Sequence, residues 1–552
     1  MPKDGKWKLF AAAGVLLLCM VAVPLFNQGI MCGDELATRF YGMHGTRQFL
    51  KSVFMEQMEK GRALSAVTLP LASYLGFLSP RNYLFRIMQA VSLFLDIGLF
   101  SYLLYKLKRD KWFSLFVAAC LAAFMPVSFE NTAPNAFCTL FNIPFAVLLL
   151  SFLWYVDFIG GRGKKYLAGS MISLFVAEMC YETFIAFTPI FLFLLLYRLD
   201  IRTEIKKIIR YLSAPFAVSC VYLALYAVCS KIFVSNYSGN QFGNFSPASS
   251  LRILWHLFKA AFPGFYVWGS PKYKFLLRFY LDFSAGEAFR ILILTAAFAF
   301  LLAVLFGKKE KEDKRFLVRT VLILLGGCIC IILPSLPIAV AEMYQGNVGE
   351  NGFVALPVTW FSYFFAVFVV CRLIWLLIGT RRTRFLVVLP CLCALLMAVQ
   401  FENGVFSQEQ NRNFRRLTDM EACLKTDLFQ SFGDAEFASE DMFETMNSMA
   451  FYDSYWTQFL NLFGSAASVV NRAPNGQENR IYVREGRMYV WHDGSLYVLD
   501  RDTVRGQALL LMEEGRAFYT DYPEPWRDHG MYVYYFDAAS IETPITKQSA
   551  VW

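Results

Sequence analysis

Charged side chains are scarce in this sequence, and so are histidines. Of its 552 residues, 17% are Asp, Glu, Lys or Arg and only four are His, whereas soluble domains carry about 25% charged residues. Hydrophobic residues make up 57% and the mean hydropathy is +0.43. This composition excludes a soluble protein, a disordered chain and a coiled coil, and it indicates a membrane protein.

The sequence also lacks the motifs of common nucleotide and metal sites. It contains no zinc signature, P-loop, G-x-S-x-G or dinucleotide fingerprint. Thirteen cysteines are present, but most lie in apolar runs. The C-x-C pairs Cys328/Cys330 and Cys391/Cys393 have no polar surroundings, so we interpret them as buried thiols. The tail holds one cysteine, Cys423, and therefore no internal disulfide.

Eleven apolar runs predict membrane spans. A span needs about 20 apolar residues, with a lower limit of about 17. The two runs around Tyr181 are the weakest, because the first is short and the hairpin between them is tight. The first run follows basic residues and lacks a clear cleavage site, so we interpret it as an uncleaved anchor. The predicted spans are 9–26, 84–105, 112–128, 136–159, 166–180, 183–199, 210–233, 288–306, 316–340, 353–378 and 385–401.

Lysine and arginine mark every second loop, which predicts the orientation of the spans. The basic segments are the N-terminus, Lys106–Lys111, Gly160–Lys165, Arg198–Arg210, Gly307–Arg319 and Arg381–Arg384. We expect them on the cytoplasmic side of the cell membrane. Loops 27–83 and 234–287 and the tail 403–552 then lie outside.

The tail differs from the rest of the chain in charge. The tail holds 13 Lys and Arg against 22 Asp and Glu, which is a net charge of −9. Because the whole chain has a net charge of +9, the first 402 residues carry +18. Basic loops in a membrane protein report topology, so nucleic-acid binding is excluded. The tail has a helical pattern over about 409–465, then alternating strand-like stretches with turn signals at Gly486 and Asp493-Gly494.

These patterns predict the fold class. The chain is mainly α, a multi-pass membrane protein with about 11 transmembrane helices and a small α+β extracytoplasmic C-terminal domain. The predicted domains are residues 1–402 and 403–552.

An acidic pair follows the first span. Asp34 and Glu35 lie a few residues past its end. A carboxylate at the mouth of a membrane cavity suits a general base, because low dielectric raises its pKa toward the working range. A hydrated stretch that caps a helix is an equally good interpretation of the position alone.

Basic residues in the outer loops are the next candidates, because the positive-inside rule does not favour them there. Arg39 and Arg62 lie in the first outer loop, and Lys272 and Arg278 in the second. Arg suits bidentate contact with phosphate. Snorkelling to lipid headgroups is the alternative for most of them. Arg62 is different, because Gly61 lets the backbone approach another group closely.

Three outer segments resemble interfacial helices: 48–60, 64–78 and 251–267, the last with Leu254, Phe258 and Ala261 at helical spacing. Glu130 and Glu182 lie in short outer turns and could reach the same outer cavity as Asp34. Asp96 lies within a span, where we favour a hydrogen bond between helices.

This pattern resembles the GT-C glycosyltransferases, multi-pass enzymes that use polyprenyl-phosphate-linked sugars. The pair Asp34-Glu35 is similar to the Asp-Glu of protein O-mannosyltransferases. The order Asp34-Glu35, Arg39, Gly42 and Gly61-Arg62 looks more like the O-antigen-modifying glucosyltransferases, and Tyr181-Glu182 falls where that family tends to show Tyr-Gln. The motifs cover residues 9–200. A late outer Arg of many relatives has no counterpart in Glu350–Trp360.

The resemblance implies an inverting hexosyltransferase on the outer face of the membrane. Asp34 would take the proton from an acceptor hydroxyl of a cell-envelope glycan, and Glu35 would position it or bind a divalent cation, Mg²⁺ or Mn²⁺. Arg39 and Arg62 would hold the phosphate of the donor. Glu130, Glu182, Lys272 and Arg278 would support the cavity.

Three other functions stay open at this point. A polysaccharide polymerase or ligase would depend on outer Arg and His. A transporter or flippase for lipid-linked glycans would favour internal repeats and broken helices. An anchoring protein would act through its tail.

Overall fold

The computed structural model consists mainly of helices. It describes residues 3–26, 45–79, 83–127, 137–199, 201–233, 239, 246–265, 284–308, 316–350, 352, 354, 356–379 and 381–424, and strands beyond residue 435; with few exceptions, side chains are described between residues 8 and 408 of these ranges. The described chain divides into two compact units. The first holds the helices up to residue 408, and the second holds the strands of the tail together with the end of the last helix, which continues from residue 409 to Leu424. The domain boundary at residue 402 stays a prediction.

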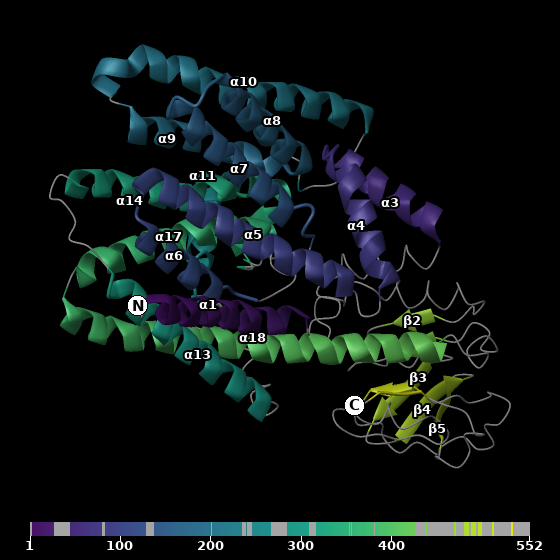
Figure 1. The fold of residues 1–552 in the computed structure, drawn as a ribbon. Coiled ribbons are helices and arrows are strands. Elements are labelled where there is room, and N and C mark those ends of the chain that lie inside the picture. The colour runs from purple at the N-terminus through teal and green to yellow at the C-terminus, as the bar shows by residue number, and fades with distance from the viewer. Residues whose placement is uncertain are drawn as a thin grey trace. The chain divides into compact units, whose positions relative to one another are not determined.

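The first unit is a bundle of helices (Figure 1). In chain order its elements are α1 (Lys3–Phe26), α3 (Thr46–Glu59), α4 (Ser65–Leu78), α5 (Tyr83–Lys108), α6 (Lys111–Ala123), α7 (Asn142–Ile159), α8 (Lys164–Cys180), the 3-10 helix η2 (Glu182–Phe187), α9 (Ile190–Arg198), α10 (Ile201–Ile232), α11 (Pro247–Ala260), α13 (Ala285–Phe306), α14 (Phe316–Ile332), η5 (Leu333–Ser335), α15 (Leu336–Val340), α16 (Glu342–Tyr344), the π-helical η6 (Gln345–Glu350), α17 (Pro357–Ile378) and α18 (Arg382–Leu424).

Each of the eleven apolar runs forms helix where the sequence predicts it. Among the described residues, eight helical segments are long and apolar enough to cross a membrane. The chain is therefore a multi-pass membrane protein with a mainly α fold. The helices α6, α8 and α9 are shorter, with 13, 17 and 9 residues. The run after Tyr181 is divided because η2 takes up its first part.

Three of the predicted basic loops meet at one end of the bundle. Lys106, in the last turn of α5, forms an ion pair with Asp157 near the end of α7. Arg162 lies 3.4 Å from the same carboxylate. Arg198, the last residue of α9, donates a hydrogen bond of 2.7 Å to the carbonyl of Lys106.

Aromatic contacts place the later basic loops at the same end. Phe306, the last residue of α13, packs against Trp375 of α17 and Phe385 of α18, with ring centroids 5.0 and 4.9 Å apart. Trp375 also contacts Phe113 at the start of α6, at 5.7 Å. We call this end the basic end, and the opposite end the outer end, after its predicted side of the membrane. The orientation in the cell stays a prediction.

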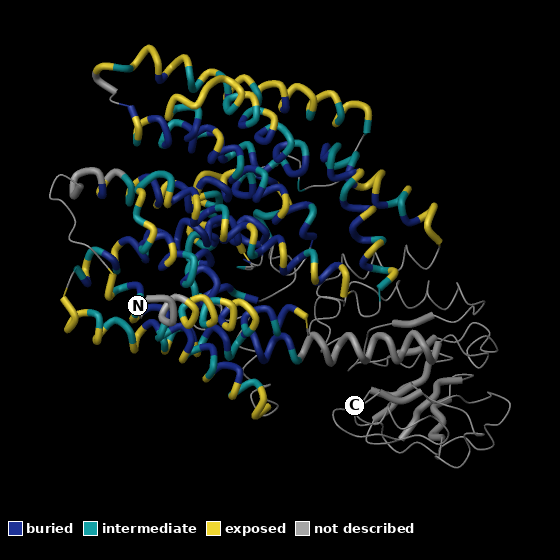
Figure 2. The backbone as a smooth tube through the Cα atoms, in the orientation of Figure 1, coloured by how far each residue is buried: buried dark blue, intermediate teal, exposed yellow. Residues whose placement is uncertain are grey.

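The centre of the bundle is α17, and its edge is α10 (Figure 2). Every residue of α17 from Pro357 to Val369 is buried. By contrast, α10 exposes large apolar side chains such as Val221 and Ile232, as expected of a helix that faces lipid. Asp96 on α5 accepts a hydrogen bond of 3.4 Å from Trp360 Nε1 on α17, which confirms the predicted contact between helices.

The thiols of the C-x-C pairs are not all buried, which corrects the sequence-based interpretation. Cys330 is buried, but Cys328 and Cys391 are exposed on the bundle surface and Cys393 is intermediate. An apolar span does not show which of its faces packs inward, because lipid and protein interior are both apolar.

The helices α3 and α4 form where interfacial helices were predicted. Their bounds, Thr46–Glu59 and Ser65–Leu78, agree with the predicted 48–60 and 64–78 to within two residues. Helix α4 exposes Val67, Leu71, Leu75 and Leu78, a stripe at spacings of three or four residues that covers one face.

Helix α11 begins and ends earlier in the chain than predicted. The helix spans Pro247–Ala260 rather than 251–267, and it begins where Ser246 caps it. Its buried residues are Ile253, Leu257 and Ala260, whereas Leu254 and Phe258 of the predicted stripe are only partly buried and Ala261 is buried just past the end of the helix. Ile253 and Leu257 join a core cluster with residues 338–358. On its other side, burial and then the cations Lys259 and Arg252 lower the pKa of His256.

The tail contains strands, as its alternating pattern predicts. The strands β3 (Arg480–Arg484), β4 (Arg487–His492) and β5 (Ser495–Leu499) form consecutive antiparallel pairs. The turn signals at Gly486 and Asp493-Gly494 lie outside the described residues. β1 (Glu436–Ala438) pairs in parallel with β2 (Ser468–Val470) and β3, and β6 (Leu510–Met512) pairs with β7 (Met531–Val533). The helical pattern predicted over 409–465 is wrong at β1, because pairing with distant strands overrides local preference.

Candidate active site at the outer end of the bundle

An arginine and a glutamate form a buried ion pair at the outer end. Arg62 Nε and Nη2 donate to Glu182 Oε2 and Oε1, each at 2.7 Å. The side chain of Arg62 is 7% exposed and that of Glu182 is 23% exposed. This fork-to-fork geometry is the strongest form of a carboxylate–arginine contact. Arg62 is therefore held inside the protein rather than extended to lipid headgroups.

A tyrosine ring supports the guanidinium. Arg62 Cζ lies 4.6 Å from the centroid of the Tyr181 ring, a cation–π distance. Tyr181 is 4% exposed and packs edge-on against Phe141, at 5.0 Å. The extended backbone of Tyr181 ends α8, so Glu182 starts η2 beside the arginine. The adjacent residues Tyr181 and Glu182 thus contact Arg62 with an aromatic ring face and a carboxylate.

Gly61 allows Arg62 to reach this position. Its φ is +73°, a conformation that favours glycine, and an added Cβ would lie 2.6 Å from the ring of Tyr226 on α10. The predicted close approach of the backbone at Gly61 is confirmed, and the group that it approaches is Tyr226.

Two hydrogen bonds attach this turn to the end of α8. Leu64 N–H donates to the carbonyl of Met179 at 3.1 Å, and Ser65 Oγ donates to that of Cys180 at 2.8 Å. The last carbonyls of a helix have no intrahelical partner. Leu64 and Ser65, at the start of α4, supply these missing donors, so the turn that carries Arg62 is attached to the end of α8 that precedes Glu182.

A second carboxylate lies one helical turn before Glu182. Glu178 is fully buried, and its Oε1 accepts hydrogen bonds from Ser219 at 2.6 Å and from Thr188 at 3.4 Å. Its Oε2 has no partner. The site therefore combines one ion-paired and one hydroxyl-bound carboxylate within five residues.

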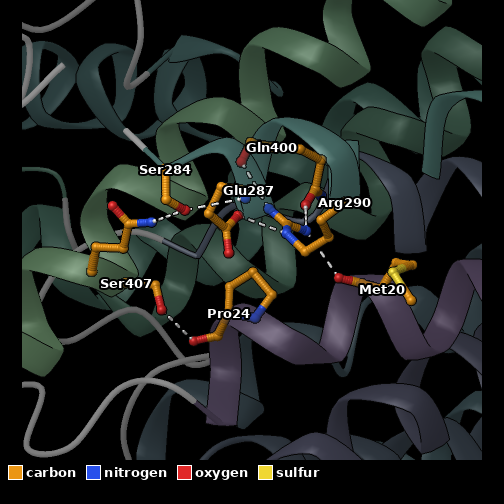
Figure 3. Close-up of polar contacts among 8 residues, drawn as sticks. Met20, Pro24, Ser284, Glu287, Arg290, Gln400 and Ser407 are labelled. Carbon is orange, nitrogen blue, oxygen red and sulfur yellow. Dashed lines mark hydrogen bonds and ion pairs between the residues drawn. The ribbon is translucent and has the colours of Figure 1, made fainter. Parts of the chain in front are cut away.

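A separate arginine network surrounds the end of α1 (Figure 3). Arg290 of α13 is 5% exposed. It donates to Glu287 at 2.7 Å, to the Met20 carbonyl at 2.9 Å, and to the side chain and carbonyl of Gln400 at 3.0 and 3.1 Å. Pro24, which lacks an N–H, cannot bond the carbonyl of Met20 four residues before it. Arg290 supplies that missing hydrogen bond from another helix, as membrane proteins require.

The same stretch of α18 fixes the chain that leaves α6. Gln400 Nε2 donates to the Ala123 carbonyl at 3.0 Å. Asn403 accepts from Val127 N–H at 2.8 Å and donates to the Met125 carbonyl at 2.9 Å. An added Cβ on Gly404 would lie 2.8 Å from Glu287 Oε2. The network therefore orients the exits of α1 and α6, the two segments after which Asp34 and Glu130 follow in the sequence.

The structure brings together two of the predicted site residues, Arg62 and Glu182. The others lie outside the described residues, and their roles remain proposals: Asp34, Glu35, Arg39, Glu130, Lys272 and Arg278. Within the described ranges, no group of three His, Cys, Asp or Glu could hold a metal ion. The predicted cation site at Asp34 and Glu35 lies outside the described residues and stays a prediction.

The polar groups inside the spans were not predicted from the sequence. Arg290, Gln400 and Asn403 are buried and hydrogen-bonded between helices, and Asn142 and Gln89 are buried as well. A signal existed, since any polar residue within an apolar run is a functional or structural candidate. Only Asp96 was weighed in this way.

Comparisons with known proteins give a distant structural likeness. Neither a protein-family model nor a curated protein matches the sequence. The fold is similar to that of ArnT from Cupriavidus metallidurans, solved with bound undecaprenyl phosphate. The TM-score is 0.36 at 16% identity, over 86% of this chain and 87% of that chain. At this level of similarity the comparison assigns no function.

Proposed function

We propose that this protein is an integral membrane glycosyltransferase. It moves a hexose from a polyprenyl-phosphate donor to a cell-envelope glycan on the outer face of the membrane and inverts the anomeric carbon. The observation that carries the proposal is the bidentate pair of Arg62 with Glu182, buried at the end of the bundle opposite the basic loops.

The position of Arg62, buried at the outer end of the bundle, is better explained by ligand binding than by topology. It does not set topology, which the basic loops at the other end do. Burial of an ion pair has a desolvation cost that its attraction often fails to exceed. A guanidinium group binds phosphate as well as carboxylate in a bidentate manner. In the proposed function Glu182 orients Arg62 until the phosphate of the donor replaces the carboxylate as acceptor of its hydrogen bonds.

A surface for the lipid tail lies close by. Arg62 is three residues before α4, whose exposed stripe is Val67, Leu71, Leu75 and Leu78. A polyprenyl chain is apolar and a phosphate is charged, so the donor needs both surfaces side by side. The loop and helix at 61–78 supply them within one segment.

The chemistry follows from the residues that precede this segment. The acceptor oxygen attacks the anomeric carbon and the bond from that carbon to the phosphate oxygen breaks. The acceptor proton moves to Asp34, and polyprenyl phosphate leaves with its charge held by Arg39 and Arg62. Glu35 positions Asp34. A divalent cation, if bound by Asp34 and Glu35, would supply charge neutralisation, and chelation tests that variant.

The test uses purified protein in nanodiscs with a polyprenyl-phosphate hexose labelled in the sugar. We expect label to pass to a glycan acceptor from the cell envelope, with release of polyprenyl phosphate. Asp34→Asn should abolish transfer and leave the thermal unfolding midpoint unchanged, because the base is lost and the shape is kept. Normal transfer by this variant would remove Asp34 from the mechanism.

The same preparation distinguishes the other functions. A flippase would move the intact lipid across liposomes without releasing its sugar. A polymerase or ligase would transfer a preassembled oligosaccharide and leave the single hexose on its lipid. Either result would replace the glycosyltransferase proposal.

A further inference from the structure

Three buried side chains on three helices form a polar layer inside the bundle. We use this name for Asp96 of α5, Asn142 of α7 and Trp360 of α17, which are 0%, 0% and 2% exposed. None of them belongs to the Arg62–Glu182 site, and the proposed mechanism does not use them.

A set of phenylalanine contacts fixes the level of this layer. Phe364 of α17 packs against Phe100 of α5 at 5.3 Å and Phe145 of α7 at 5.2 Å. Each member of the polar layer lies three or four residues before one of these rings, on a helix that runs from the outer end to the basic end. The polar layer therefore lies about one turn nearer the outer end than the rings. We call the rings the aromatic floor.

The polar layer has unused hydrogen-bonding capacity. Both side-chain atoms of Asn142, Oδ1 and Nδ2, are buried without a partner, and so is Asp96 Oδ1. A buried polar atom without a partner costs about 1–3 kcal/mol. Three such atoms at one level, inside a membrane protein, are expected to meet a polar group that binds there.

Neighbouring contacts decide which atoms are available. Trp360 Nε1 donates to Asp96 Oδ2, which leaves Oδ1 as an acceptor. Gln89 lies on α5 two turns nearer the outer end than Asp96, outside the polar layer. Its Oε1 accepts a hydrogen bond of 2.9 Å from Arg86, and its Nε2 is a buried donor without a partner. Asn142 offers both kinds. Sugar hydroxyls both donate and accept, so this fixed set complements a polyol.

The polar layer is connected to the proposed phosphate site by one aromatic contact. Phe141, adjacent to Asn142, packs against Tyr181, and the Tyr181 ring lies under Arg62. The start of α7, where Asn142 lies, is therefore next to the aromatic ring that supports Arg62.

We propose that Asn142 and Asp96 bind the hydroxyls of the donor sugar, with the aromatic floor beneath it. This inference rests on the proposed function, because it assigns the sugar end of the same donor. The predicted ligand is a neutral hexose-type ring, and Asn142 is the residue on which recognition depends most.

The test separates the sugar from the lipid. Purified protein in nanodiscs is titrated with polyprenyl phosphate and, separately, with polyprenyl-phosphate hexose, and the two dissociation constants are compared. We expect the sugar to tighten binding by about tenfold, as one or two hydrogen bonds supply. Asn142→Leu should remove this preference and leave the affinity for polyprenyl phosphate unchanged. Asp96→Asn, which keeps the Trp360 hydrogen bond, should reduce it.

The thermal unfolding midpoint of Asn142→Leu distinguishes a binding role of Asn142 from a structural one. Asn142→Leu removes two unpaired polar atoms, so its thermal unfolding midpoint should stay the same or rise. A fall would mean that Asn142 supports the fold, and it would overturn the inference if the sugar preference survived. Ser101→Ala is the control, because Ser101 Oγ is also buried and unpaired on α5 but lies on the basic side of Phe100. Ser101→Ala should leave the sugar preference unchanged, and its thermal unfolding midpoint should also stay the same or rise.

The outcomes for the two proposals differ. Equal affinity for both lipids in the unaltered protein, or a preference that Asn142→Leu leaves intact, overturns the sugar site and would assign ordered water to these atoms. Failure of both lipids to bind overturns the proposed function itself.

Discussion

The two arginine–glutamate pairs at the outer end of the bundle are alike in distance and different in their surroundings. Arg62–Glu182 and Arg290–Glu287 each have a contact of 2.7 Å, and both arginines are almost fully buried. Glu182, however, is 23% exposed against 11% for Glu287. Arg290 also bonds the backbone carbonyls of Met20 and Gln400 on two other helices.

This difference separates a pair that can exchange its partner from one that cannot. A carbonyl inside the membrane has no water to replace a lost donor, so Arg290 is fixed by the helices that it joins. The fork of Arg62 ends on a carboxylate that solvent or a ligand can reach. The same chemical pair therefore serves structure in one place and, as proposed, binding in the other.

The largest expected effect is on the structural pair. Arg290→Met should destabilise the protein by about 3–5 kcal/mol, because it leaves Glu287 buried without its cation and the Met20 carbonyl without a donor. Thermal unfolding in detergent measures this. Pro24→Ala restores the N–H that bonds Met20, so the double variant should recover part of the loss. No recovery would mean that Arg290 does not compensate for the proline.

Substitution of Arg62 should affect transfer activity more than stability. Arg62→Gln should lower transfer by about 100-fold or more, as removal of one transition-state donor does, and raise the Michaelis constant for the lipid donor more than that for the acceptor. Glu182 is partly exposed, so the unfolding midpoint should fall less than in Arg290→Met. Unchanged dependence on donor would show that Arg62 does not contact it.

Gly61→Ala tests how closely Arg62 is held. The added Cβ would lie 2.6 Å from Tyr226 at a φ of +73°, and we expect a loss of about 1–2 kcal/mol from the backbone conformation together with weaker donor binding. Gly61→Ala with Tyr226→Leu should recover the part due to the ring. Gly404→Ala is the matched change at the other arginine, and it should affect stability without a specific effect on donor binding.

The smallest effect concerns a single hydrogen bond. Ser407 Oγ donates to the Pro24 carbonyl at 2.8 Å. Ser407→Ala should reduce stability by about 0.5–1.5 kcal/mol and leave the Michaelis constants unchanged. A change in donor binding from this variant would show that the network around α1 also belongs to the site, and the comparison between the two arginines would then fail.

Local patterns predicted the helical regions and one pair of residues of the candidate site. Apolar run length placed all eleven helical regions, because the bilayer sets it. Gly61 marked a close approach that the structure contains, and Arg62 and Glu182, 120 residues apart, were both expected at the outer cavity and do meet.

Contacts between distant segments could not be predicted in the same way. Arg290 and Gln400 are 110 residues apart, and no spacing in the sequence relates them. On α11 residues 253 and 257 and residues 254 and 258 are all apolar, and only the segment packed against the helix decides that 253 and 257 are the fully buried ones. The parallel pairing of β1 with β3 is likewise set by tertiary contacts.

The aromatic floor has an electrical consequence. The proposed sugar site would bring polar groups into the apolar part of the bundle, and the membrane potential would then act across the residues between that site and the basic end. Moving one elementary charge through 100 mV involves about 2.3 kcal/mol, so a leak of protons through such a site would drain an energised membrane. Phe100, Phe145 and Phe364 interlock without polar atoms and act as an insulator beneath the polar layer.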